Sequence, residues 1–213
     1  MRKLLAASAL AACLTAPGLA SAQDLSISAG FSLVSRYVSN GFEQTTGGAF
    51  QPWIEAEMRG FYLGLWLSNT DDVITGSDYE VDVYLGYRGE VGKFSYDIGY
   101  ARYYYKNPHV DCCGEVYLSL GYAVTDAFNV GLAFAHDPVA DYVDTTLSMD
   151  YAFNDKFGVA AEYGSVSNGG VEYWKVGGTY TINDKVSITG AWHDNDLVDG
   201  IFVVSLDTSF SLR

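Results

Sequence analysis

Residues 60–68 read GFYLGLWLS, and this stretch decides how the rest of the chain is interpreted. Phenylalanine or leucine occupies every second position from 61 to 67, and Tyr62, Gly64, Trp66 and Ser68 fill the positions between. An alternation with period two predicts a β-strand whose two faces meet different surroundings. Because the second face is aromatic rather than charged, its environment has to be inferred from the other strands.

The same alternation recurs along the chain and predicts twelve strands. In the segment 79–88, apolar residues alternate with a row that contains Glu80, Asp82 and Tyr84, so one face is apolar and the other mixed. The predicted strands are 25–38, 49–59, 60–69, 79–88, 93–105, 115–124, 127–136, 142–153, 156–164, 171–182, 185–193 and 201–212.

Short and long connections alternate strictly between these strands. The five short turns lie at 59–60, 89–92, 125–126, 154–155 and 183–184, and the six other connections are longer, such as SNGFEQTTGG at 39–48. This pattern is typical of an outer-membrane β-barrel with short periplasmic turns and longer extracellular loops. A soluble β-sandwich, the alternative, has no reason to alternate in this way. We therefore predict an all-β fold, a single 12-stranded antiparallel transmembrane β-barrel.

The first 22 residues have the features of a secretory signal peptide. MRKLLAASALAACLTAPGLASA begins with Arg2 and Lys3, continues with an apolar stretch and ends on an A-x-A site before Gln23. An alternative is cleavage at a lipoprotein-like box, which would leave a lipidated Cys13. We expect residues 1–22 to be the signal peptide and residues 23–213 to form the barrel.

Composition and charge narrow the class of partner. The chain is rich in aromatic residues, at 15%, and no stretch of 18 consecutive apolar residues is present. Without the leader it has 10 Lys and Arg against 26 Asp and Glu, a net charge of −16. Such an acidic chain is a poor partner for nucleic acid, whereas cations or a neutral ligand are compatible with it.

The two rows of each strand can be assigned once a barrel is assumed. Apolar rows face lipid, with aromatic residues near the strand ends in the interfacial belts, and mixed rows face the lumen. The expected lumen-lining residues are Arg36, Glu55, Glu57, Tyr62, Trp66, Glu80, Asp82, Tyr84, Asp97, Tyr103, Glu115, Tyr117, Glu162, Glu172 and Lys175.

An acidic and aromatic lumen favours a narrow passive channel for small solutes, with a preference for cations. The alternative is a non-conducting structural or surface-interaction barrel, in which Arg36 and Lys175 bind carboxylates and side chains fill the interior. Enzymatic hydrolysis is disfavoured, because no His lies beside a Ser on the same outward face. No cofactor is expected.

Two loops contain residues that resemble metal ligands. Cys112 and Cys113 are adjacent in HVDCCGE, where a disulfide is favoured over a metal site because the compartment is oxidising. Asp194, Asp196 and Asp199 in HDNDLVDG offer oxygen ligands suited to calcium, although such clusters more often form turns.

The segment SLVSRYVSNGFEQTTGGAFQPWIEAEMRGFYLGLWLSN, residues 32–69, resembles the opening signature of the Gcw_chp family of proteobacterial outer-membrane proteins. The chain departs from the family pattern at Asn40, where Arg is usual, and in its adjacent cysteines. The resemblance implies an outer-membrane location in a Gram-negative bacterium, with lipid and lipopolysaccharide as neighbours, and implies no activity. Small solutes or ions are the partners that the predicted lumen suggests. The matching residues are Ser35, Tyr37, Gly41, Gln44, Gly60, Phe61, Tyr62, Gly64, Trp66, Ser68 and Asn69.

Overall fold

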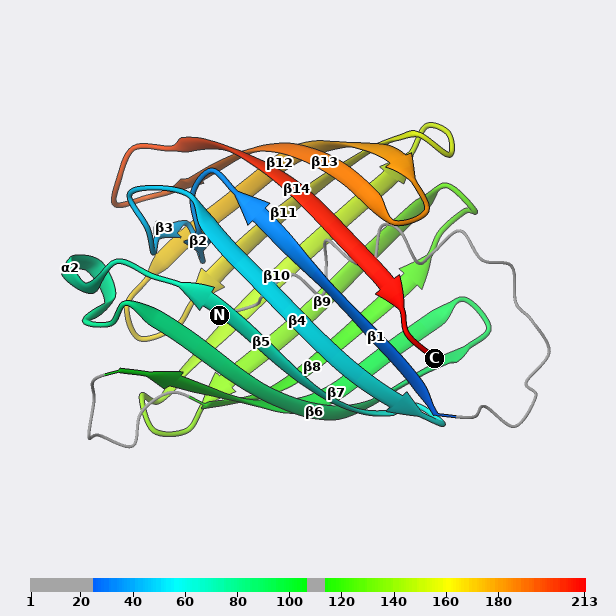
Figure 1. The fold of residues 1–213 in the computed structure, drawn as a ribbon, viewed down its shortest axis with the longest axis horizontal. Helices are drawn as coiled ribbons and strands as arrows, with labels where there is room; N and C mark the ends of the chain where they lie inside the picture. Colours follow the sequence, from blue (N-terminus) through cyan, green and yellow to red (C-terminus); the bar gives the residue numbers. More distant parts are fainter. Residues whose placement is uncertain (1–24, 107–113) are drawn as a thin grey trace.

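The chain forms a closed barrel of twelve antiparallel strands, as predicted (Figure 1). A computed structural model describes residues 25–106 and 114–213. The barrel closes because β1 pairs with β4 on one side and with β14 on the other. The strands are β1 Ser26–Val34, β4 Ala49–Met58, β5 Phe61–Asn69, β6 Tyr79–Val91, β7 Phe94–Tyr105, β8 Gly114–Ala123, β9 Phe128–Asp137, β10 Tyr142–Ala152, β11 Phe157–Val166, β12 Val171–Asn183, β13 Val186–Asn195 and β14 Ile201–Ser211.

The period-two alternation sorts the side chains of β5 into two environments. Phe61 is 66% exposed and faces outward, whereas Tyr62 and Trp66 are 4% and 6% exposed and point into the barrel. The other strands follow the same rule, so that leucine, valine, phenylalanine and tyrosine cover the outer wall. Apolar side chains thus lie on the outside and polar ones inside, which is the opposite of their distribution in a water-soluble sheet protein.

The two ends of the barrel differ, as the alternating connections predict. Short turns, the start of β1 and the end of β14 lie at one end, and the longer loops lie at the other (Figure 1). At the first short turn, Arg59 and Gly60 both adopt positive φ, at 55° and 85°. This backbone matches the two-residue hairpins that suit the right-handed twist of antiparallel strands.

The first long loop is more ordered than the sequence predicts. The strand expected over 25–38 ends at Val34, and the chain then forms a small separate hairpin from β2 (Val38–Ser39) and β3 (Phe42–Glu43). Alternation extends into this hairpin, but its pairing partner is the loop itself rather than the barrel.

The second long loop contains a single helical turn, α2 (Asp72–Thr75), which ends at Gly76 with a φ of 73°. No helix in the described ranges is long and apolar enough to cross a membrane. The helical turn lies at the long-loop end, next to the start of β6 (Figure 1).

Tyrosine rings on the inner wall lie over glycines of the neighbouring strand. Four directly paired positions have this combination, and in each a Cβ on the glycine would overlap the tyrosine ring. Glycine thus makes room for a large ring to lie flat against the wall. The pairs are Gly64 with Tyr84, Gly86 with Tyr62, Gly99 with Tyr117, and Gly164 with Tyr173.

We expect Gly164→Ala to lower the free energy of unfolding by about 1–3 kcal/mol, because the added methyl displaces the Tyr173 ring. Urea unfolding of the refolded protein in detergent measures this change. Gly178→Ala is the matched control, since its Cβ would meet only the Gly158 carbonyl oxygen at 3.8 Å. Equal stability of the two variants would contradict a packing role for Gly164.

Candidate functional site in the barrel lumen

The half of the lumen near the short turns is organised around Arg88. This residue lies on the inner face of β6, where its guanidinium forms an ion pair with Glu55 of β4. Its Nε lies 3.0 Å from Oε2 of Glu57 on the same strand, and its Cζ lies 4.1 Å from the centroid of the Tyr62 ring. One cation therefore neutralises two carboxylates and stacks on an aromatic ring.

Tyr62 connects this group to the next strands. Its hydroxyl donates a hydrogen bond of 2.5 Å to Oδ1 of Asp97 on β7. The hydroxyl of Tyr117 on β8 lies 2.6 Å from the Tyr62 hydroxyl oxygen. A phenol that donates to a carboxylate stabilises the anion and adds no charge of its own. The cluster thus holds three carboxylates, of which Arg88 contacts Glu55 and Glu57.

The half of the lumen near the long loops has carboxylates bound by pairs of tyrosines. Glu80 accepts hydrogen bonds from Tyr37 at 3.0 Å and from Tyr105 at 2.7 Å. Both oxygens of this carboxylate are therefore hydrogen-bonded, and the residue is 0% exposed. Phenolic donors satisfy the buried oxygens while adding no positive charge.

Glu115 of β8 is bound in the same way as Glu80. It accepts from Tyr103 of β7 at 2.6 Å and from Tyr142 of β10 at 2.8 Å, and it is 1% exposed. The two glutamates therefore form a repeated arrangement, one carboxylate between two phenols, on neighbouring parts of the wall.

Further around the wall, β10 and β12 repeat the combination of carboxylate and phenol. The Tyr173 hydroxyl lies 2.9 Å and 3.1 Å from the two oxygens of Asp144 and 3.2 Å from the hydroxyl of Thr146. Lys175, on the same row as Tyr173, lies 3.6 Å from Glu162 of β11. Inward acidic side chains therefore continue around the barrel, and the inward basic residues are fewer.

These polar contacts follow the wall. The hydrogen bonds and ion pairs named above between inward side chains of two barrel strands join strands at most three places apart in the ring. Arg88 reaches β4 from β6, and Lys175 forms its ion pair with the adjacent β11. The polar network thus braces neighbouring strands and leaves opposite walls unconnected by these pairs.

Most of the expected lumen residues do point inward, and two do not. Arg36 lies beyond the end of β1 in the first long loop, where its Nε is 3.0 Å from Oε2 of Glu43. Glu172 is exposed on the outer face, because Tyr173 and Lys175 occupy the inward row of β12. The inward set comprises Glu55, Glu57, Tyr62, Trp66, Glu80, Asp82, Tyr84, Asp97, Tyr103, Glu115, Tyr117, Glu162 and Lys175.

Sequence reasoning missed three contributors to the lumen. Tyr142 and Tyr173 were not among the expected lining residues, although each lies on the same row as an inward residue, Asp144 and Lys175 respectively. Tyr37 was placed at the end of a barrel strand, and it enters the lumen from a loop instead. Strict counting of period two along β10 and β12 would have found the first two.

The predicted metal and disulfide residues have no site in the described ranges. Oδ1 of Asp194 accepts from the backbone of Asn195, and Oδ1 of Asp196 accepts from the backbone of Glu172, as in ordinary turns. Within the residues that the structure describes, no group of three His, Cys, Asp or Glu side chains is placed to hold a metal ion. Cys112, Cys113, Cys13 and the predicted signal peptide lie outside those residues.

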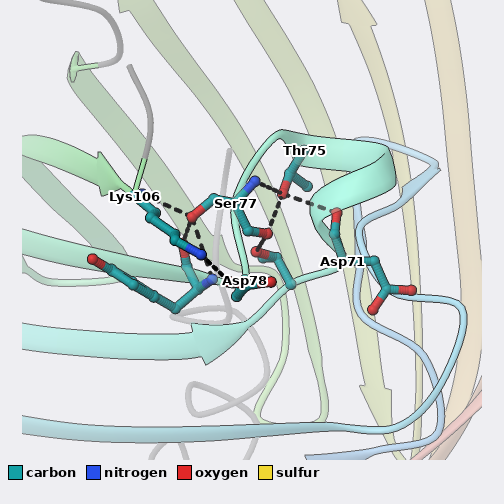
Figure 2. Close-up of polar contacts among 7 residues, drawn as sticks. Asp71, Thr75, Ser77, Asp78 and Lys106 are labelled. Carbon is teal, nitrogen blue, oxygen red and sulfur yellow. Dashed lines mark hydrogen bonds and ion pairs between the residues drawn. The ribbon is translucent and has the colours of Figure 1, made fainter. Parts of the chain in front are cut away.

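Polar contacts hold the long loops together at the rim of the lumen. The Ser77 hydroxyl oxygen accepts from the Lys106 backbone at 2.8 Å, and Nζ of Lys106 lies 2.5 Å from Oδ2 of Asp78 (Figure 2). The carboxylate of Asp78 raises the pKa of Lys106. The second long loop and the end of β7 are therefore joined through both backbone and side chain.

Asp71 joins the second long loop to the first. Its Oδ2 accepts from the backbone N–H and the hydroxyl of Thr46, at 2.6 Å and 2.5 Å, and these hydrogen bonds lower the pKa of Asp71. The contacts are retained above the ordinary pKa of a carboxyl group and are lost as the pH falls through the lowered value. At neutral pH the first long loop is therefore tied to its neighbour.

Comparison with known proteins identifies a family and a fold. Residues 19–210 match the model of the Gcw_chp family, described as a bacterial protein of unknown function, and this match confirms the resemblance seen in residues 32–69. No curated protein matches the sequence significantly.

Two solved structures share the fold. The KdgM porin has a TM-score of 0.66 at 15% identity, over 86% of this chain and 99% of that chain. The KdgM porin in complex with disordered oligogalacturonate has a TM-score of 0.63 at 15% identity, over 87% of this chain and 99% of that chain. At this identity the likeness concerns the fold.

We expect Arg88→Gln to lower the free energy of unfolding by roughly 1–3 kcal/mol, because Glu55 and Glu57 then repel each other in a partly buried site. Adding Glu55→Gln to this variant is expected to restore part of the loss, since one carboxylate is removed. Urea unfolding of the single and double variants measures both effects. Additive losses in the double variant would show that Arg88 and Glu55 do not act together.

Proposed function

Because the chain belongs to the Gcw_chp family, whose description names no function, we propose a function from the lumen itself. The protein acts as a passive channel for small solutes in the outer membrane of a Gram-negative bacterium, with a preference for cations. The proposal includes no catalytic step and no cofactor.

The outer wall supports a membrane location. Leu63, Leu65 and Leu67 of β5 are each at least 41% exposed, which is unfavourable in water and favourable in lipid hydrocarbon. Closure of the sheet gives the backbone groups of every barrel strand partners on both sides, as lipid requires. The expected neighbours are outer-membrane lipid and lipopolysaccharide, with the short turns on the periplasmic side.

The single observation that carries the proposed passage is the course of the polar contacts along the wall. A filled structural barrel would have Arg36 and Lys175 bound to carboxylates across the lumen. Instead Arg36 pairs with Glu43 in the loop, and Lys175 pairs with Glu162 on the adjacent strand. Neither basic side chain therefore forms the ion pair across the lumen that an interlocked core was expected to have, and this supports a passage.

The charge of the lumen supports a preference for cations. Among the described residues, the inner wall carries more acidic side chains than basic ones, and fixed negative charge in a region of reduced dielectric constant favours cations. Arg88 and Lys175 offset this charge only in part. An oligogalacturonate, the ligand in one KdgM porin complex, is itself a chain of carboxylates and is expected to be repelled here.

Planar-bilayer recording on the purified protein in a KCl gradient tests the channel directly. We expect the reversal potential to have the same sign as the equilibrium potential of K⁺ in this gradient, because the negative wall concentrates cations in the passage. Protein-free bilayers with the same detergent serve as the control. Absence of conductance, or a reversal potential of the opposite sign, would contradict the proposal.

Neutralising two buried carboxylates tests the origin of the preference. The double variant Glu80→Gln/Glu115→Gln keeps an acceptor for the tyrosine hydroxyls and removes two negative charges, so the K⁺ over Cl⁻ permeability ratio is expected to fall about twofold or more. Glu172→Gln removes one charge from the outer face and is expected to leave the ratio unchanged. An equal change in both variants would exclude a lumenal origin.

A further inference from the structure

The hairpin of β2 and β3 lies in the mouth of the barrel. Val38 pairs with Glu43 and Ser39 with Phe42, and the turn between them uses Asn40 and Gly41, with φ values of 50° and 78°. The remaining segments of the first long loop connect this hairpin to the ends of β1 and β4 (Figure 1). The hairpin is therefore a compact unit with its own backbone pairing.

The base of the hairpin is fixed to one side of the lumen by Tyr37. Its hydroxyl donates to Oε2 of Glu80 on β6 at 3.0 Å, and its ring centroid lies 5.7 Å from that of Trp66 on β5. The backbone of Tyr37 also donates to the Thr45 hydroxyl at 2.9 Å. Tyr37 is 3% exposed, so this side chain is packed rather than solvated.

The tip of the hairpin contacts the other side of the lumen. The side-chain nitrogen of Asn195, at the end of β13, donates to the Gly41 carbonyl oxygen at 2.7 Å. A Cβ on Gly41 would lie 2.8 Å from Cβ of Asn195 and 2.9 Å from Cβ of Tyr173 on β12. No residue with a side chain fits between Gly41 and these two neighbours. Glycine is therefore required at position 41 both for its positive φ and for its small size.

The two attachment points lie on opposite walls. In the ring of strands, five strands separate β6 from β12 in either direction. Tyr37 contacts β6 and Gly41 contacts β12, so the hairpin extends across the mouth from one wall toward the other. Its outer side is tied as well, since Arg36 pairs with Glu43 and Asp71 accepts from Thr46.

We infer, on the premise that the barrel conducts, that residues 37–45 form a fixed constriction that sets the size limit of the passage. The hairpin crosses the route that a solute takes from the long-loop end to the lumen, and it is attached at both ends of its span. The described polar pairs within the barrel wall do not cross the lumen in this way. The constriction is therefore formed by a loop. The barrel wall determines the charge preference of the passage, and the hairpin determines the largest solute that can pass.

Replacing Val38–Glu43 by Gly-Ser-Gly tests the inference. Single-channel conductance in KCl is expected to rise about twofold or more, and liposome swelling is expected to extend from glycerol to a trisaccharide such as raffinose. Heat-modifiable migration on gels shows whether the variant folds. Unchanged conductance and an unchanged size limit in a folded variant would overturn the inference.

A pair of glycine variants keeps the test valid if the replacement does not fold. Gly41→Ala and Gly76→Ala place the same methyl on the same left-handed backbone, at φ of 78° and 73°, but a Cβ on Gly76 meets nothing within 4 Å. Gly41→Ala is expected to add open-channel fluctuations and raise mean conductance, and Gly76→Ala is expected to match the wild type. Identical recordings from both variants would overturn the inference.

Asn195→Asp tests the attachment of the tip alone. Its carboxylate keeps the oxygen that accepts from Leu197 and Val198, but turns a second oxygen toward the Gly41 carbonyl. Increased conductance supports the inference, and unchanged conductance contradicts it. If the wild type is silent and the replacement variant conducts, the hairpin closes the passage completely. The proposed function then fails, and the position of the narrowest point is supported while its role as a size limit is not. If neither conducts, both fail.

Discussion

Pairing of every backbone group within a closed ring of strands is the constraint on which the rest of this structure depends. β1 binds β4 and β14, so no strand of the barrel has a free edge, and a wall of this kind tolerates lipid on its outer surface. Closure also makes the alternation of each strand unambiguous, because one side of the sheet is the interior for all twelve strands. Whether a side chain faces lipid or the lumen therefore depends on whether it lies at an odd or an even position along its strand.

The interior of the barrel places negative charge beside phenols as well as beside cations. Arg88 serves Glu55 and Glu57 near the short turns, whereas Glu80 and Glu115 are held by tyrosine hydroxyls near the long loops. Neutral donors satisfy buried oxygens and leave the net charge in place, whereas cations cancel it. The two halves of the lumen therefore differ in the donors that contact their carboxylates, a guanidinium near the short turns and phenols near the long loops.

The sequence alone predicts the wall well and the mouth poorly. Phe61 to Ser68 show the two faces because strand geometry imposes period two, and Arg59–Gly60 shows a turn because only a short hairpin fits there. Glu172 was misplaced because a charged side chain was expected to face the lumen. In a barrel the alternation along the strand decides the direction, and Glu172 lies at an outward position of β12. Arg36 and Tyr37 could not be placed, since an extended loop hairpin has the same local pattern as the end of a strand. Only the tertiary contacts distinguish the two, above all that of Tyr37 with Glu80 on β6.

The contact between Gly41 and Asn195 has a consequence for the order in which the molecule assembles. The two residues are 154 positions apart, and β13 is the penultimate strand of the chain. Contacts of such long range form late, because the intervening chain must be arranged first. During biogenesis we expect the contact between Gly41 and Asn195 to form only when the C-terminal strands have joined β1. If residues 37–45 form the constriction inferred above, the mouth of the barrel reaches its final width only once β13 is in place.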